Sequence, residues 1–199
     1  MKHFQKIAIV FAVFIAGLPA FSQVSGSASG PLQLSVFGAG TGTWTGLQGG
    51  KNLAVTAGVD LSFRKYRGFR PAVEVRGTYP IHGGHFVSEE SFLVGPKVEY
   101  AYGKFRPYGD FLIGRGAMNY QNGGYLYTDS RGITITYFQS TSTVLSPGIG
   151  IDYSLTRQWA VKGDAQYQHW NTPVTASGTL NSKVLSAGIV YRFSFGKFY

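Results

Sequence analysis

Apolar and polar residues alternate with a period of two along most of the chain, which predicts β-strands whose two faces meet different surroundings. This alternation is carried by eight segments, at residues 32–44, 53–65, 71–81, 90–102, 107–118, 142–155, 159–170 and 183–195. Each is at least as long as the roughly 9–11 residues that a tilted strand needs to cross a bilayer. The pattern therefore predicts an all-β fold of eight strands.

Two kinds of connection join the predicted strands. Tight turns follow the second, fourth and sixth strands, at residues 66–70, 103–106 and 156–158. The other connections are longer, rich in Gly, Ser, Thr and Asn, and lie around residues 45–52, 82–89, 119–141 and 171–182. Short turns at one end and long loops at the other are typical of antiparallel up-and-down barrels in membranes.

A weak internal repeat supports this arrangement. Residues 66–71 (YRGFRP) return as residues 102–107 (YGKFRP). Proline is tolerated at the first position of a strand because the hydrogen-bond ladder has not fully begun there. We therefore expect these two turns at the same end of the molecule.

The alternation fits two architectures, a soluble barrel with its apolar face inside and a membrane barrel with that face outside. Aromatic residues concentrate at strand ends, as in an interfacial girdle: Phe63, Tyr66, Tyr79, Tyr100, Tyr102, Trp159, Tyr191 and Phe193. The opposite face carries acids and bases in nearly equal number: Asp60, Arg64, Glu74, Arg76, Lys97, Glu99, Asp110, Asp152, Lys162, Asp164 and Arg192. Such a balanced set favours a charge network inside the lumen of a transmembrane β-barrel. The alternation does not decide whether Arg115 faces the lumen or lipid headgroups.

The first residues resemble a secretory signal peptide. Lys2 and Lys6 precede an apolar run over residues 7–18, and the small-residue pattern that follows predicts cleavage near Ser22. We therefore expect a signal peptide at residues 1–22 and one barrel domain at residues 23–199. No later stretch is apolar enough for a membrane helix, so strands would have to cross the membrane.

Composition and charge narrow the class of protein further. Charged residues make up 14% and aromatic residues 16% of the chain, a mixture that indicates an ordered protein. The chain contains no Cys, which excludes disulfides, thiolate metal sites and lipoprotein anchoring. Its net charge of +9 would suggest nucleic acid, but an exported chain does not meet the chromosome. The excess of positive charge collects instead at the short-turn end, beside expected anionic headgroups: Lys65, Arg67, Arg70, Lys104, Arg106, Arg157 and Lys197.

The most specific motif is SAGIVYRF at residues 186–193, in which Ser186, Gly188, Tyr191 and Phe193 fit the pattern polar, Gly, aromatic, aromatic. It resembles the signal by which the barrel-assembly machinery recognises the last strand of outer-membrane proteins, although six residues follow it here. Together with FRPYG at 105–109 and GDAQYQHW at 163–170, it makes the mature chain similar to OmpA-like, porin-family outer-membrane β-barrels. The resemblance implies location in the cell outer membrane and contact with its lipids, including lipopolysaccharide. The chain stops at the barrel, so we expect no peptidoglycan-binding domain.

Two clusters of residues are candidates for chemistry, one for catalysis and one for metal binding. Lipid A deacylases are similar barrels with a His, Ser and acid triad, but the residue two after His169 is Asn171, and no acid follows Asp164. The second cluster places His82 and His85 near Glu89 and Glu90 in a predicted loop, a set that could hold a metal ion. Because the triad is incomplete, we expect that the chain is not an enzyme. Loop residues such as those of the second cluster are more often simply solvated, so we expect no metal ion and no other cofactor.

An eight-stranded barrel has an interior that its own side chains can fill. We therefore expect a structural, adhesive or surface-recognition role, with at most a small-solute pore, and with loops outside and termini in the periplasm. The tyrosine-rich segment 119–141 could extend its hairpin above the membrane and meet an extracellular partner. The alternatives are a soluble periplasmic barrel that binds a small apolar ligand, or a barrel enzyme acting on lipid A.

Overall fold

The computed structural model describes residues 32–45, 50–82, 87–120, 124–128, 132–172, 175 and 177–193. The expected signal peptide at 1–22 and Lys197 lie outside these residues. Antiparallel strands account for most of the described chain: β1 (Gln33–Trp44), β2 (Lys51–Ser62), β3 (Phe69–His82), β4 (Val87–Tyr100), β5 (Phe105–Tyr120), β6 (Tyr125–Thr128), β7 (Thr134–Tyr137), β8 (Gln139–Ser154), β9 (Trp159–Asn171) and β10 (Thr179–Arg192).

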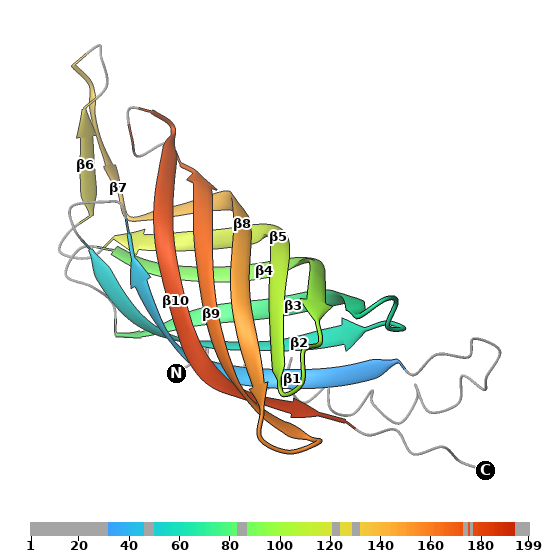
Figure 1. The fold of residues 1–199 in the computed structure, drawn as a ribbon. Helices are drawn as coiled ribbons and strands as arrows, with labels where there is room; N and C mark the ends of the chain where they lie inside the picture. Colours follow the sequence, from blue (N-terminus) through green and yellow to red (C-terminus); the bar gives the residue numbers. More distant parts are fainter. Residues whose placement is uncertain are drawn as a thin grey trace, which may run out of the picture. The chain divides into compact units, whose positions relative to one another are not determined.

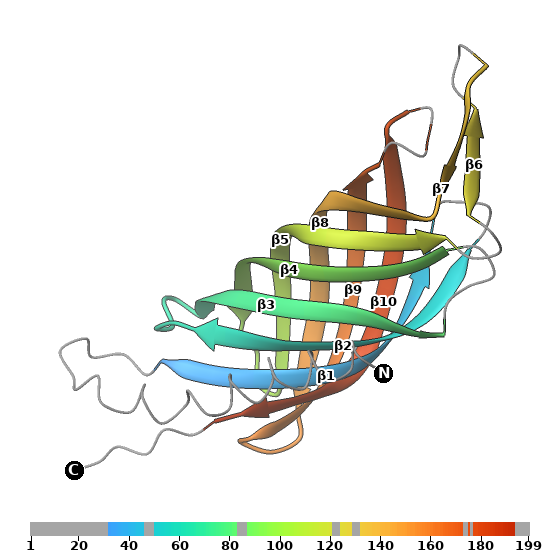
Figure 2. The same cartoon turned by 180° about the vertical axis from the view of Figure 1, so that it is seen from behind.

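Eight of these strands form a closed barrel in the order β1-β10-β9-β8-β5-β4-β3-β2, as the sequence predicts. The barrel closes where β1 pairs with β10 over ten consecutive residue pairs, from Ser35 with Arg192 to Trp44 with Lys183. The remaining strands, β6 and β7, pair only with each other and form a hairpin between β5 and β8. Figures 1 and 2 show this hairpin extending beyond the loop end of the barrel.

The short turns have the backbone geometry that their glycines allow. Tyr66 and Phe69 bond to each other across Arg67 and Gly68, whose φ angles of 48° and 93° are those of a type I′ turn. Tyr102 and Phe105 do the same across Gly103, which has a φ of 59°. The two copies of the repeat therefore form hairpin turns at the same end, as predicted.

The strands extend further toward the loop end than the sequence predicts. β8 begins at Gln139 instead of residue 142, and β10 at Thr179 instead of 183. The added residues include Ser140 and Ser182, which are buried inside the barrel. Small polar residues are typical of loops, but here they line the inner face of the barrel wall. All four predicted long loops are therefore too long, since β2 and β4 also begin earlier than predicted, at Lys51 and Val87.

The outer wall is apolar and the inner face largely polar. Ile149, Phe92 and Leu185 are 70%, 61% and 52% exposed, whereas Glu74 and Lys162 are almost completely buried. At the turn end, rings of neighbouring strands pack with centroids about 5 Å apart, in the pairs Phe69–Tyr100, Phe105–Tyr153 and Trp159–Tyr191. This is the inverted arrangement that a membrane barrel requires. Within the described residues, no helix is both long and apolar enough to span a bilayer.

Candidate functional site in the barrel interior

Lys97 on β4 is the centre of the first group of charges inside the barrel. Its Nζ lies 3.0 Å from Asp60 Oδ2, 3.1 Å from Glu74 Oε2 and 3.7 Å from Glu99 Oε1. The register explains the contacts, because Asp60 pairs with Glu74 across β2 and β3 and all four residues face inward. One ammonium group therefore compensates carboxylates from three strands.

Arg76 on β3 is the centre of a second group. Its guanidinium binds Asp164 across the lumen with Nη1 to Oδ1 at 2.8 Å, and it also contacts Glu74. Asp110 Oδ2 lies 3.7 Å from Nη2. Because Glu74 also forms an ion pair with Lys97, the two groups form one network across the interior.

The other predicted charges join this network or lie beside it, with one exception. Lys162 Nζ is 3.6 Å from Glu74 Oε2, and Arg192 Nη2 is 3.1 Å from Asp152 Oδ2. Arg64 is exposed, so its predicted place in the lumen is wrong. The physical reason is that β2 ends at Ser62, and alternation stops with the strand.

The sequence did not decide whether Arg115 faces the lumen or lipid headgroups. In the structure, Arg115 is exposed on the outer face of β5. Its neighbours across the sheet are Phe92 of β4 and Thr143 of β8. Phe92 is itself 61% exposed, so Arg115 belongs to the outer wall and not to the lumen.

The sequence analysis missed neutral residues that complete the network. Tyr108 donates to Asp164 at 2.9 Å, and its ring lies 3.9 Å from Lys97 Nζ. Gln166 donates to Asp110 at 2.9 Å, and Phe37 places its ring 4.2 Å from Lys162 Nζ. Tyr108 and Gln166 each lie two residues from a predicted charge on the same inner face, and Phe37 lies on β1, which carries no predicted charge. An analysis of all inward positions with a period of two could have found them.

The predicted assembly-signal residues divide between the two faces of β10. Ser186 is buried and bonds to Thr41, in a row of hydroxyl groups that continues through Thr56 to Thr78 at 2.7–3.0 Å. Gly188 faces inward where a Cβ would overlap the backbone of β1. Tyr191 and Phe193 pack edge to face at 5.0 Å. Their role in assembly stays a prediction.

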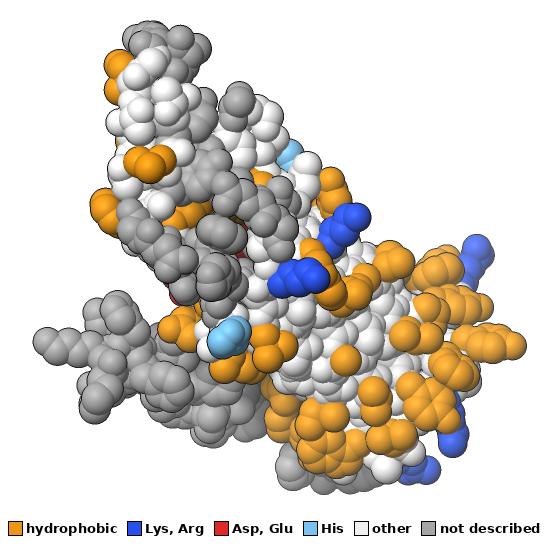
Figure 3. All heavy atoms as spheres, turned by 90° about the vertical axis from the view of Figure 1, so that its left-hand side faces the viewer, with side chains coloured by type: hydrophobic (Ala, Val, Ile, Leu, Met, Phe, Trp, Pro, Cys, Tyr) orange, Lys and Arg blue, Asp and Glu red, His pale blue; other side chains and the backbone are white. Residues whose placement is uncertain are grey.

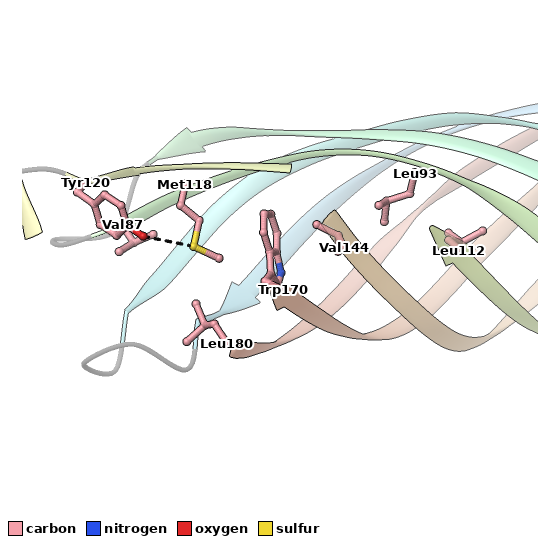
Figure 4. Close-up of a cluster of buried hydrophobic side chains, with 8 residues drawn as sticks. All are labelled: Val87, Leu93, Leu112, Met118, Tyr120, Val144, Trp170 and Leu180. Atoms are coloured by element: carbon pink, nitrogen blue, oxygen red, sulfur yellow. Dashed lines mark hydrogen bonds between the residues drawn. The ribbon is translucent and has the colours of Figure 1, made fainter. Parts of the chain in front are cut away.

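An apolar cluster fills the interior toward the loop end, next to the charge network. It consists of Val87, Leu93, Leu112, Met118, Tyr120, Val144, Trp170 and Leu180 (Figure 4). The two regions meet where Leu93 pairs with Arg76 and where Leu112 follows Asp110 on the inner face of β5. Glu89 is buried near this end and accepts a bond of 2.9 Å from Ser182.

The two clusters tested for chemistry are not assembled as a site. His169 Nδ1 lies 2.7 Å from the side-chain oxygen of Asn181, a group that titrates no proton. His82 is exposed while Glu89 points into the barrel, and His85 lies outside the described residues. Among the residues that the structure describes, no group of three His, Asp or Glu side chains could hold a metal ion.

A sequence-family model for the outer membrane protein beta-barrel domain matches residues 8–193. The chain belongs to this family. The resemblance to outer-membrane barrels is therefore confirmed, together with location of this barrel protein in the outer membrane. No functionally curated protein matches the chain in sequence.

Solved structures share the fold of this outer-membrane barrel at low sequence identity. Neisserial surface protein A is 16% identical with a TM-score of 0.51, over 81% of this chain and 97% of that one. The attachment invasion locus protein Ail of Yersinia pestis is 12% identical (TM-score 0.48), over 83% of this chain and 100% of its own. The outer membrane enzyme PagL is 17% identical (TM-score 0.43), over 80% and 99%. The likeness to Neisserial surface protein A indicates the fold and, at 16% identity, no activity.

Proposed function

We propose that this protein is a non-enzymatic outer-membrane barrel with a closed lumen, which acts through surface recognition by the β6–β7 hairpin. The loop end would face outward and both chain ends the periplasm. The observation that carries the proposal is the apolar surface of the hairpin. Leu126, Ile135 and Phe138 are 67%, 43% and 65% exposed, and Ile133 is 55% exposed.

The hairpin is attached to the barrel but built separately from it. Tyr120 N donates to Phe138 O at 3.0 Å where the hairpin leaves the wall. Beyond that point β6 and β7 pair only with each other, from Tyr125 with Tyr137 to Thr128 with Thr134. Exposed apolar side chains on a projecting loop are typical of a recognition surface.

The interior supports the closed lumen. Arg76 of β3 binds Asp164 of β9 on the opposite side of the barrel, and Lys97 binds carboxylates of three adjacent strands. Trp170 and Leu112 are fully buried in the apolar cluster. A small barrel filled in this way leaves no open path for solutes. His169 is bonded to Asn181 and not to an acid as in the deacylase triad, which supports a role other than lipid A hydrolysis.

The proposal is tested by adhesion of whole cells. A host without adhesins displays the native chain or Leu126→Ser/Ile135→Ser/Phe138→Ser, and cells held under flow on extracellular-matrix proteins are counted. The control, Thr134→Ser/Thr136→Ser, keeps the apolar side chains of the same hairpin. We expect retention by the native chain and the control, and loss to the vector level in the triple variant. Equal retention in all strains would contradict the proposal.

A further inference from the structure

Charges are sorted between the inside and the outside of the barrel. Every Asp and Glu that the structure describes is buried or half-buried. The exposed Lys and Arg lie near its two ends, with Lys51, Arg115 and Lys183 toward the loop end and these toward the turn end: Arg64, Lys65, Arg67, Lys104 and Arg157. On the face drawn in Figure 3, blue side chains likewise lie toward the ends and red is almost absent. The fully exposed charges of the described outer surface are therefore all basic, and the half-buried Glu90 is the acid on the outward side of β4.

Two of the loop-end lysines flank one tryptophan. Trp44, the last residue of β1, pairs with Lys51 of β2 on one side and with Lys183 of β10 on the other. Directly paired residues of antiparallel strands point to the same face, and all three are exposed. Neighbouring strands are about 4.8 Å apart, so the two lysine backbones are roughly 10 Å apart with the indole between them. Tyr167 continues the row, since it pairs with Lys183.

An apolar row lies one step deeper in the wall. Gly42 pairs with Leu53 and Leu185, which are 55% and 52% exposed. The Trp44 ring lies over Gly42, since a Cβ on this glycine would be 3.4 Å from Cη2 of the indole. Further along β1, Gly40 sits between Val55 and Ala187. The glycines of β1 thus leave a shallow apolar track that leads away from the two lysines.

The wall is hollowed where this track meets β10, and the hollow crosses the neighbouring strands β9, β8 and β5. An open depression of about 790 Å³ takes in Gly40, Leu185 and Ala187 and continues over Ala165 and Ile149. Its outward lining is aliphatic or glycine, whereas the lysines and Trp44 lie at the loop end of the same strands. A ligand that fits both parts must join a strongly anionic group to an acyl chain.

We propose that Lys51, Trp44 and Lys183 bind a phosphate group of lipid A, the anchor of lipopolysaccharide, with an acyl chain on the β1 track. The choice of lipid A rests on the proposed orientation, in which this end meets the outer leaflet. Lysine ammonium groups bind phosphate as point charges, and tryptophan favours the boundary between headgroups and chains. The absence of exposed carboxylates in the described wall leaves the phosphate without a repelling neighbour.

The test uses the purified barrel in detergent and native mass spectrometry to count bound lipid. The probes are bisphosphorylated lipid A, dephosphorylated lipid A and phosphatidylglycerol. The variant Lys51→Gln/Lys183→Gln is matched by Lys65→Gln/Lys104→Gln, which removes the same charge from the turn end. The mobility shift of the folded band on heating verifies that each barrel is intact.

We expect Lys51→Gln/Lys183→Gln to weaken lipid A binding by about tenfold or more, since each lysine near an anionic surface contributes appreciably. The turn-end variant should bind lipid A as the native barrel does. Equal losses in both variants, or equal binding of dephosphorylated lipid A, would overturn the site. Equal binding of phosphatidylglycerol would overturn lipid A as its ligand. This assay measures lipid binding and not cell adhesion through the hairpin. Either proposal can therefore fail without the other.

Discussion

Gly116 of β5 lies directly beneath the six-membered ring of Trp170 of β9, although β8 separates these strands in the barrel. A Cβ on residue 116 would overlap ring atoms Cη2 and Cζ3 and would also meet the carbonyl of Glu90. The largest fully buried side chain thus reaches over its neighbouring strand and needs a glycine there.

Gly116→Ala should therefore destabilise the barrel by about 1–3 kcal/mol, because the indole is packed on all sides and has to shift. Gly77→Ala is the control, since a Cβ there has no atom within 4 Å. Urea titration of the folded band on a gel measures both. Equal midpoints for the two variants would show that Trp170 is not held as the structure places it.

Lys97→Met should cost about 3–5 kcal/mol, because it leaves several buried carboxylates without their shared cation. Arg64→Met removes the same charge from an exposed position and should leave the unfolding midpoint unchanged. A similar loss in both variants would indicate that net charge, and not the internal network, stabilises the barrel.

Replacement of residues 126–136 by a short Gly-Ser turn should leave barrel stability unchanged, because it keeps Tyr137, which packs against the apolar cluster. The β5–β8 ladder already begins at Asn119 with Gln139, and the hairpin pairs only with itself beyond Phe138. The same urea titration measures this variant. A lower midpoint would mean that the hairpin stabilises the barrel and is more than a separate recognition element.

The proposed orientation is tested with single cysteines, since the native chain contains none. Thr136→Cys on β7 should react with a membrane-impermeant maleimide in intact cells. Lys104→Cys in a short turn should react only after the outer membrane is opened. The reverse labelling pattern would place the loop end in the periplasm.

The sequence predicts the eight strands of the barrel from period-two alternation and their up-and-down order from the short turns and long loops between them. The polar inner face is predicted from its balanced charges and from the aromatic residues at the strand ends. It fails at Arg64, where alternation continues in the sequence after β2 has ended at Ser62. Where a strand ends depends on its pairing with the neighbouring strand. The residue pattern of one strand alone carries no information about that pairing.

The apolar half of the interior was missed for a related reason. Leu112 and Leu93 face inward between outward residues that are also apolar, so these stretches carry no alternation to interpret. Trp170 faces inward between His169 and Asn171, so there the apolar residue lies on the inner face. Gly116 and Gly150 gave no signal either, yet each leaves room for a ring from another strand, Trp170 and Tyr108 respectively. Such contacts depend on which strands lie beside one another in the barrel and on their register.

The most direct test of the account is the conductance of the purified native barrel in a planar bilayer. A lumen filled by the Lys97 and Arg76 network and by the cluster around Trp170 predicts no steady current above that of the bare bilayer. Native mass spectrometry of the same preparation should show monomers, so that any current belongs to a single barrel. A steady ohmic current from the folded native protein would contradict the closed lumen and make this protein a pore.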